Sequence, residues 1–111
     1  MDIVETRASD AVTLALKGRL DGASSPGFEQ RVLALINAGD HRLVIDLAQL
    51  DYISSVGLRV FMLAAKRLKP VGGRVVLCGL QPGVTQVFEI AGFSTIFPMA
   101  ATREEASALL A

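Results

Sequence analysis

Two adjacent serines, Ser54 and Ser55, are the residues of this chain best placed to do chemistry. They fall where an apolar segment, typical of a buried strand, gives way to an amphipathic pattern that predicts a helix. The first N–H groups of a helix have no partners within it, and the helix dipole is positive there. One interpretation is that a serine caps the helix. The other is that a serine accepts a phosphate, which would meet free N–H donors and a favourable dipole.

The surroundings of the two serines favour contact with another protein. Small and apolar residues flank them, namely Ile53, Val56, Gly57 and Leu58. A neutral serine suits such a contact, whereas a phosphate would have to be desolvated and would be repelled by nearby acids. Gly57 would allow close backbone approach or close packing of a partner. Arg59 lies one helical turn after Ser55 and could pair with the phosphate or with the partner.

The chain has one histidine and one cysteine. Cys78 lies in an apolar run and is expected to be buried, and a single cysteine excludes a disulfide framework or a cysteine zinc site. His41 is expected in an exposed turn at the far end of the strand that precedes Ser55. A hydrolase using Ser55 would therefore lack a base, and we expect no enzymatic activity.

Three acidic residues are expected in loops at one edge of the sheet: Asp21, Asp46 and Asp51. Grouped carboxylates can bind a metal, but aspartate also caps helices and closes turns, and we expect that structural role. The glycines do not have the spacing of a known phosphate loop. We therefore expect neither a metal nor a cofactor.

Alternating strand and helix patterns predict an α/β fold, a single domain spanning residues 1–111. Strands are expected at 3–7, 12–16, 43–47 and 74–78, with a short edge strand at 96–97, and helices at 26–38, 54–69, 82–90 and 103–110. Ser9–Asp10 should form a turn and residues 18–22 a loop, and Ser25 and Thr102 should cap helices. The βαβ order predicts a mixed, mostly parallel sheet of four to five strands with about four helices packed on it.

Composition limits the classes of function. The 111 residues are 51% hydrophobic and 20% charged, with no net charge. A folded globular chain without a positive field is not expected to bind nucleic acid directly. The longest apolar run, residues 60–65, is far shorter than the ~20 residues of a membrane span, and no targeting segment is visible. We therefore expect a cytoplasmic protein with no membrane association.

The segment from Val44 to Leu58, VIDLAQLDYISSVGL, resembles the signature of bacterial anti-sigma factor antagonists, the STAS domain family. The resemblance covers nearly the whole chain. It includes GRLD at residues 18–21, GGRVVLC at residues 72–78, and the segment from Pro82 to Phe93. These motifs, in this order and at this length, are specific for the family.

The resemblance implies a partner switch. The unphosphorylated protein would bind an anti-sigma factor that is also a serine kinase of the GHKL type, which releases a sigma factor or another target. The kinase would then use ATP to phosphorylate the antagonist and end the interaction, and a PP2C-type phosphatase would reverse it. The acceptor of the family lies two residues before the glycine of the motif, which is Ser55 here. By the same resemblance, Asp21 lies near the acceptor and contributes to kinase contact.

This sequence departs from the commonest family pattern beside the acceptor. Ser54 stands where the family often has Asp, and Val56 stands where it often has Ser or Thr. Ser54 is therefore an alternative acceptor. The partner-binding residues expected are Asp21, Ser54, Ser55, Val56, Gly57, Leu58 and Arg59, and the free protein is expected to be a monomer. A different hypothesis is a small-molecule or nucleotide sensor, with an anion site formed by Asp21, Asp51 and the helix start at Ser55.

Overall fold

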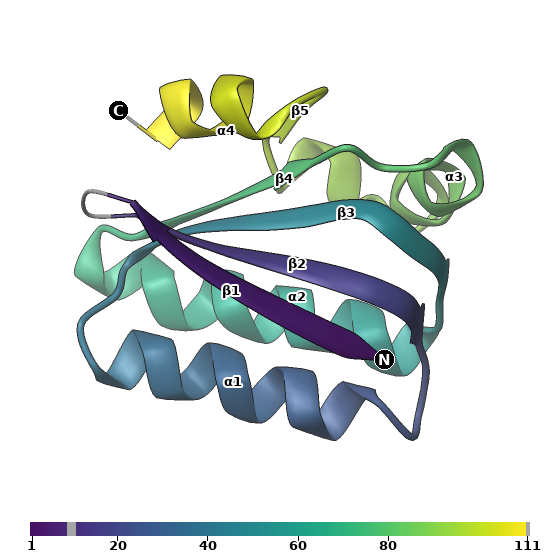
Figure 1. Ribbon diagram of the computed structural model, residues 1–111, viewed down its shortest axis with the longest axis horizontal. Helices are drawn as coiled ribbons and strands as arrows, with labels where there is room; N and C mark the ends of the chain where they lie inside the picture. The colour runs from purple at the N-terminus through teal and green to yellow at the C-terminus, as the bar shows by residue number, and fades with distance from the viewer. Residues whose placement is uncertain (9–10, 111) are drawn as a thin grey trace.

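The computed structural model describes residues 1–8 and 11–110, which form one five-stranded sheet with helices on both faces (Figure 1). The elements are β1 (Asp2–Ala8), β2 (Ala11–Leu20), α1 (Ser25–Asn37), β3 (Arg42–Ile53), α2 (Ser55–Leu68), the 3-10 turn η1 (Lys69–Val71), β4 (Arg74–Cys78), α3 (Pro82–Ile90), the 3-10 turn η2 (Phe93–Thr95), β5 (Met99–Ala100) and α4 (Arg103–Leu110). The strands lie in sequence order, with β1 antiparallel to β2 and every later pair parallel. The predicted α/β class and mixed, mostly parallel sheet are confirmed.

The main core lies between the sheet and the pair α1 and α2 (Figure 1). Alternate residues of β2 point into it, and Val12, Leu14 and Leu16 are fully buried, because successive side chains of a strand face opposite ways. The Phe61 ring of α2 lies 5.3 Å from the Phe28 ring of α1 and 5.3 Å from the Phe88 ring of α3. These aromatic contacts join the three helices within the main core.

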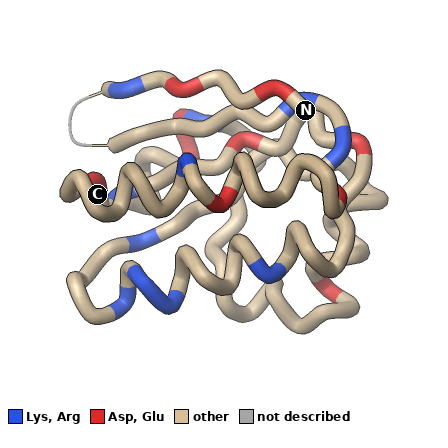
Figure 2. Tube along the Cα trace, turned by 90° about the horizontal axis from the view of Figure 1, so that it is seen from below, with Lys and Arg blue, Asp and Glu red and all other residues tan. Residues whose placement is uncertain are grey.

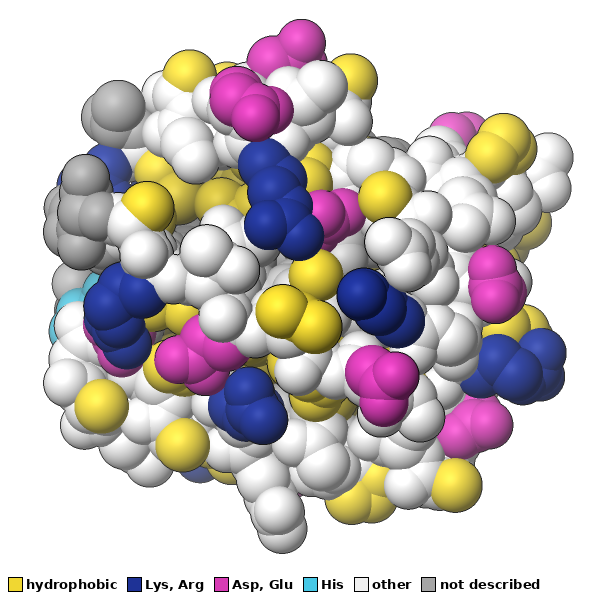
Figure 3. Space-filling view, in the orientation of Figure 1, with side chains coloured by type: hydrophobic (Ala, Val, Ile, Leu, Met, Phe, Trp, Pro, Cys, Tyr) yellow, Lys and Arg dark blue, Asp and Glu magenta, His cyan; other side chains and the backbone are white. Residues whose placement is uncertain are grey.

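The other face of the sheet is covered by α4, which packs on a small second core. That core consists of Val44, Val76, Cys78, Ala106 and Leu110. The expected cap at Thr102 is confirmed, because its hydroxyl accepts a hydrogen bond from the Glu105 N–H at 3.1 Å. On the face shown in Figure 3, side chains of both charges are interspersed, and the Nε of Arg103 lies 2.6 Å from a carboxylate oxygen of Asp46.

Four local predictions need correction or fall outside the described residues. Residues 18–20 continue β2 instead of forming a loop, since Gly18 takes a φ of 110° and the register with β3 shifts there, as in a bulge. β3 likewise runs on to Ile53. The last strand is β5, not residues 96–97, because Phe97 is buried in the main core. The turn expected at Ser9–Asp10 lies outside the described residues.

The start of α1 also differs from the prediction. The helix begins at Ser25, so the capping position belongs to the residue before it, Ser24. Ser25 is buried, and its hydroxyl donates to the carbonyl oxygen of Asp21 at 2.6 Å. Within residues 1–8 and 11–110, no helix has the length and apolar character needed to cross a membrane.

Candidate functional site

Ser54 joins β3 to α2 and caps the helix. Its backbone is extended, and its Oγ accepts a hydrogen bond from the Gly57 N–H at 3.3 Å. Its own N–H donates to the carbonyl oxygen of Leu20 at 2.9 Å, which ties the start of α2 to the end of β2. The capping role proposed for one of the two serines therefore belongs to Ser54.

Ser55 is the first residue of α2, and its side chain is exposed. Its hydroxyl makes no hydrogen bond to the described part of the chain. The first turn of α2 contains no acidic residue. The positive end of the helix dipole is therefore open to an added negative group at Ser55, while the neighbouring hydroxyl is already used for capping.

Of the two roles expected for Gly57, the structure shows close backbone approach. A Cβ at this position would lie 2.8 Å from Cγ of Leu20 and 3.1 Å from Cγ1 of Ile53. Only glycine therefore allows the first turn of α2 to sit against β2 and β3 without displacing them. Leu58 is half-buried and packs against the same core. Of the residues predicted on α2 to contact a partner, Ser55, Val56 and Arg59 are exposed.

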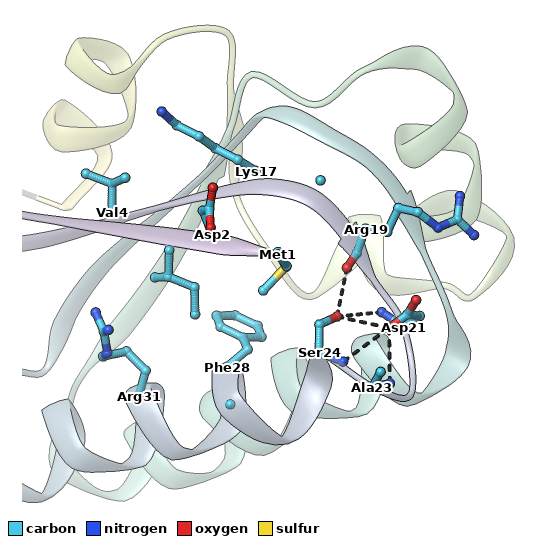
Figure 4. Close-up of a pocket in the computed structure, with 13 residues that line it drawn as sticks. Met1, Asp2, Val4, Lys17, Arg19, Asp21, Ala23, Ser24, Phe28 and Arg31 are labelled. Carbon is cyan, nitrogen blue, oxygen red and sulfur yellow. Dashed lines mark hydrogen bonds between the residues drawn. The ribbon is translucent and has the colours of Figure 1, made fainter.

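Asp21 lies beside the start of α2, because the residue before it accepts the hydrogen bond from Ser54. Its Oδ1 accepts hydrogen bonds from the N–H groups of Ala23, at 3.0 Å, and Ser24, at 3.1 Å (Figure 4). The hydrogen bond from the Ser24 backbone is the largest cause that lowers the pKa of Asp21. The predicted neighbourhood of Asp21 and the serines is therefore present, and Asp21 also closes the turn before α1.

Arg19 and Tyr52 belong to the same surface and were missed from the sequence. They are partners in the β2–β3 register, and the Arg19 guanidinium lies 4.2 Å from the centre of the Tyr52 ring. Both side chains are exposed, and Tyr52 lies three positions before Ser55 in the chain. Arginine and tyrosine are frequent in the energetic centres of protein interfaces. The sequence did not predict this contact, because both residues were expected in loops and only the pairing of β2 with β3 brings them together.

A hollow of about 510 Å³ continues from this surface along α2 toward α1. Val56, Met62 and Leu63 supply its apolar part, and Arg59 and Lys66 supply positive charge, opposite Glu29 of α1. Val56 is 42% exposed, which is high for a large apolar side chain. Exposed apolar surface next to the Ser55 hydroxyl is what a protein contact would bury.

Of the other residues considered for chemistry, Asp46 lies in contacts that stabilise the fold and His41 lies away from Ser55. Asp46 lies within β3 and pairs with Arg103, and its Oδ1 also accepts from the Ala48 N–H at 3.0 Å. Asp51 is exposed. The described residues contain no group of three His, Cys, Asp or Glu side chains that could hold a metal ion. The twelve-residue strand β3 separates His41 from Ser55, so these two residues lie at opposite ends of the sheet.

These features define an α/β domain that exposes a serine at a helix start, and comparison with known proteins identifies the family. The sequence model of the STAS domain matches residues 3–106, and the chain belongs to the STAS domain family. A protein of Bordetella bronchiseptica named as an anti-sigma factor antagonist, BtrV, is 44% identical over 108 residues, which are 97% of this chain and 93% of that protein. The anti-sigma-B factor antagonist of Listeria monocytogenes is 30% identical, covering 84% of this chain and 82% of its own.

Solved structures share the fold. SpoIIAA, an anti-sigma factor antagonist, matches in its unphosphorylated form with a TM-score of 0.86 at 23% identity, over 97% of this chain and 95% of SpoIIAA. SpoIIAA of Bacillus in its phosphorylated form matches with a TM-score of 0.79 at 21% identity, over 99% of this chain and 100% of SpoIIAA. The match to the STAS domain model and the sequence relatives confirm the resemblance to the STAS domain family.

Proposed function

We propose that this protein is an anti-sigma factor antagonist that works without catalysing a reaction and is switched by phosphorylation of Ser55. In the unphosphorylated state it binds an anti-sigma factor that is also a GHKL-type serine kinase, and the kinase releases its target. Phosphorylation of Ser55 ends the binding, and a PP2C-type phosphatase restores it. The relatives named as anti-sigma factor antagonists support the class of partner.

The observation that carries the proposal is the exposed Ser55 hydroxyl at the start of α2, where the first turn holds no acidic residue. A kinase can reach this oxygen without unfolding the chain. In the transfer, Oγ of Ser55 forms a bond to the γ-phosphorus of ATP, the bond from that phosphorus to ADP breaks, and the hydroxyl proton leaves to the kinase. The product places a phosphate where the dipole of α2 tolerates negative charge.

The same surface explains how the phosphate would end binding. Tyr52, Val56 and Arg59 are exposed around Ser55, so a partner that covers them also covers the hydroxyl. A phosphate carries close to two negative charges at neutral pH and must lose water when it is enclosed. A 100-fold loss of affinity needs only ~2.7 kcal/mol. Repulsion and desolvation of one phosphate within a close contact are sufficient, and no change of fold is required.

Ser54 is the alternative acceptor, and its environment makes it the poorer one. Its side chain is half-buried and its Oγ already accepts the Gly57 N–H. A phosphate on Ser54 would replace a capping group that holds the first turn of α2. We therefore assign the switch to Ser55 and a structural role to Ser54.

Intact-mass measurement after incubation with the cognate kinase and ATP tests the assignment. The wild-type chain and Ser54→Ala should each gain one phosphate, and Ser55→Ala should gain none. Because Ser54→Ala removes a cap, its circular dichroism spectrum should be recorded to show that it is folded. A phosphate retained by Ser55→Ala and lost by Ser54→Ala would show that the acceptor is Ser54.

A further inference from the structure

The charges of this chain are unevenly distributed. Residues 52–88 contain no Asp or Glu and five Lys or Arg residues, namely Arg59, Lys66, Arg67, Lys69 and Arg74. In Figure 2, α2 accordingly carries basic residues, drawn in blue, and no acidic residue, which would be red. Four of the five lie toward the end of α2 that is opposite to Ser55. Lys69 follows Ser55 by fourteen residues, a separation of about 20 Å along a helix.

A hollow of about 370 Å³ lies at this basic end, between the end of α2, the start of β4 and residues 96–98. Lys69 and Arg74 are its charged lining residues, and neither forms an ion pair within residues 1–8 and 11–110. Ile96 contributes an apolar wall and is 45% exposed, and Val71 beside Lys69 is 51% exposed. The hollow therefore combines unpaired positive charge with exposed apolar surface.

β4 borders this hollow and is only partly paired on that side. β4 pairs with β5 only at Leu77 and Cys78. On the side that faces β5, the Leu77 N–H donates to the Pro98 carbonyl, and the N–H of Gly79, just after the strand, donates to the Ala100 carbonyl. Because N–H directions alternate along a strand, the Val75 N–H points to the same side. It has no backbone carbonyl partner there among the described residues. Val75 is 6% exposed, and a partly paired strand edge of this kind is a template for a further extended chain.

The backbone around the hollow is already fixed. The Gly72 N–H donates to the Lys69 carbonyl and the Gly73 N–H to the Leu68 carbonyl, which closes the end of α2. A Cβ on Gly73 would lie 2.6 Å from the His41 carbonyl oxygen, so glycine is needed for this close approach. A ligand would therefore bind to a preformed shape, which reduces the entropy lost on binding.

We propose that this hollow binds an extended, acidic and apolar segment of a second protein. A backbone carbonyl of the segment accepts the Val75 N–H, its carboxylates pair with Lys69 and Arg74, and an apolar side chain covers Ile96. The basic charge of the surface selects an acidic segment and disfavours a basic one. The site lies at the far end of α2 from Ser55 and does not depend on the proposed function, so the chain can hold this segment in either phosphorylation state.

Nuclear magnetic resonance titration with a defined probe tests the proposal. The probe is a six-residue peptide, blocked at both ends, that alternates glutamate with valine; the matched peptide has glutamine in place of glutamate. The glutamate peptide should shift the amide signals of Gly73, Val75 and Ile96 in a saturable manner. The glutamine peptide should bind at least tenfold more weakly, and added salt should weaken the glutamate peptide.

Variants locate the binding on the surface. Lys69→Glu and Arg74→Glu should each weaken binding about tenfold. Arg67→Glu changes the net charge equally at the same end of α2 but does not line the hollow, so it should change binding less than twofold. Ser55→Asp should leave peptide binding unchanged, which separates failure of this proposal from failure of the switch. The dispersion of each variant's spectrum shows whether it is folded, and the salt and glutamine tests need no variant.

Four results would overturn the proposal. The first is no saturable shift at millimolar glutamate peptide. The second is equal binding of the glutamine peptide. The third is an equal loss in Arg67→Glu, which would indicate attraction by net charge alone. The fourth is that inorganic phosphate shifts the same amides as strongly as the peptide, which would indicate a small-anion site.

Discussion

The Oγ of Ser54 lies 3.3 Å from the backbone nitrogen of Gly57 and caps α2, while the next side chain, Ser55, lies in solvent. Two chemically identical neighbours thus have different tasks. Ser54 holds the first turn of the helix, and Ser55 is the exposed residue that we propose as the phosphate acceptor. A change of charge at Ser55 would therefore leave the Ser54 cap, and the stability that it provides, in place.

Stability measurements on the two serines should therefore differ. Ser54→Ala removes the cap and should lower the free energy of unfolding by about 1 kcal/mol. Ser55→Ala removes an exposed hydroxyl and should change it by less than about 0.5 kcal/mol. Urea unfolding followed by circular dichroism measures both. Equal losses in the two variants would contradict the division of roles.

Gly57 and Gly27 form a matched pair of helical glycines. Gly57→Ala would place a Cβ 2.8 Å from Leu20 and should destabilise the fold by about 1–3 kcal/mol. Gly27 of α1 has nothing within 4 Å of an added Cβ, so Gly27→Ala should stabilise the fold by up to about 1 kcal/mol. Thermal unfolding of the two variants gives the signs directly. A stabilised Gly57→Ala would show that the close packing of α2 is not required.

Arg7 and Asp40 form an ion pair whose effect depends on pH. The Arg7 guanidinium donates to both carboxylate oxygens of Asp40, and this hydrogen bonding lowers the pKa of Asp40. A lowered pKa means that the folded state favours the carboxylate. The contribution to stability is therefore present above the ordinary aspartate pKa of about 3.9 and is lost as the pH falls through the lower pKa of the folded state.

Unfolding of Asp40→Asn at two pH values checks this sign. The variant should be less stable than the wild type at pH 7, and the difference should shrink at a pH below the folded pKa, where Asp40 is protonated. Asp2→Asn removes a carboxylate outside the pair and should show no such dependence. A difference for Asp40→Asn that stays constant with pH would contradict the ion pair.

Cys78 should be unreactive in the folded chain. Burial is the largest cause that raises the pKa of its thiol, to about 11, so the nucleophilic thiolate is scarce at pH 8. Alkylation by iodoacetamide should be slower by on the order of 100-fold in the native protein than in urea, and mass spectrometry measures both rates. Similar rates in the two conditions would show that α4 does not cover Cys78.

Periodicity predicted the order of strands and helices, because each long element repeats its apolar residues at the spacing of its own geometry. It failed at the C-terminal end of β2, where Gly18 was expected in a loop but lies at a shift in the strand register. It also failed at β5, because two residues are too few to show a period.

The candidate site was predicted only where it is contiguous in the chain. The motif around Ser55 placed the serines at a helix start, which the structure confirms. The contact of Arg19 with Tyr52 depends on the register between two strands, which local patterns do not determine. The packing of Gly57 against Leu20 likewise depends on tertiary structure, so the sequence left open whether this glycine serves close backbone approach or contact with a partner.

Calorimetric titration of the cognate kinase with the unphosphorylated chain and with the chain phosphorylated at Ser55 tests the central claim most directly. The unphosphorylated chain should bind, and the phosphorylated chain should bind at least 100-fold more weakly, with both circular dichroism spectra alike. Equal affinities of the two forms would contradict the account.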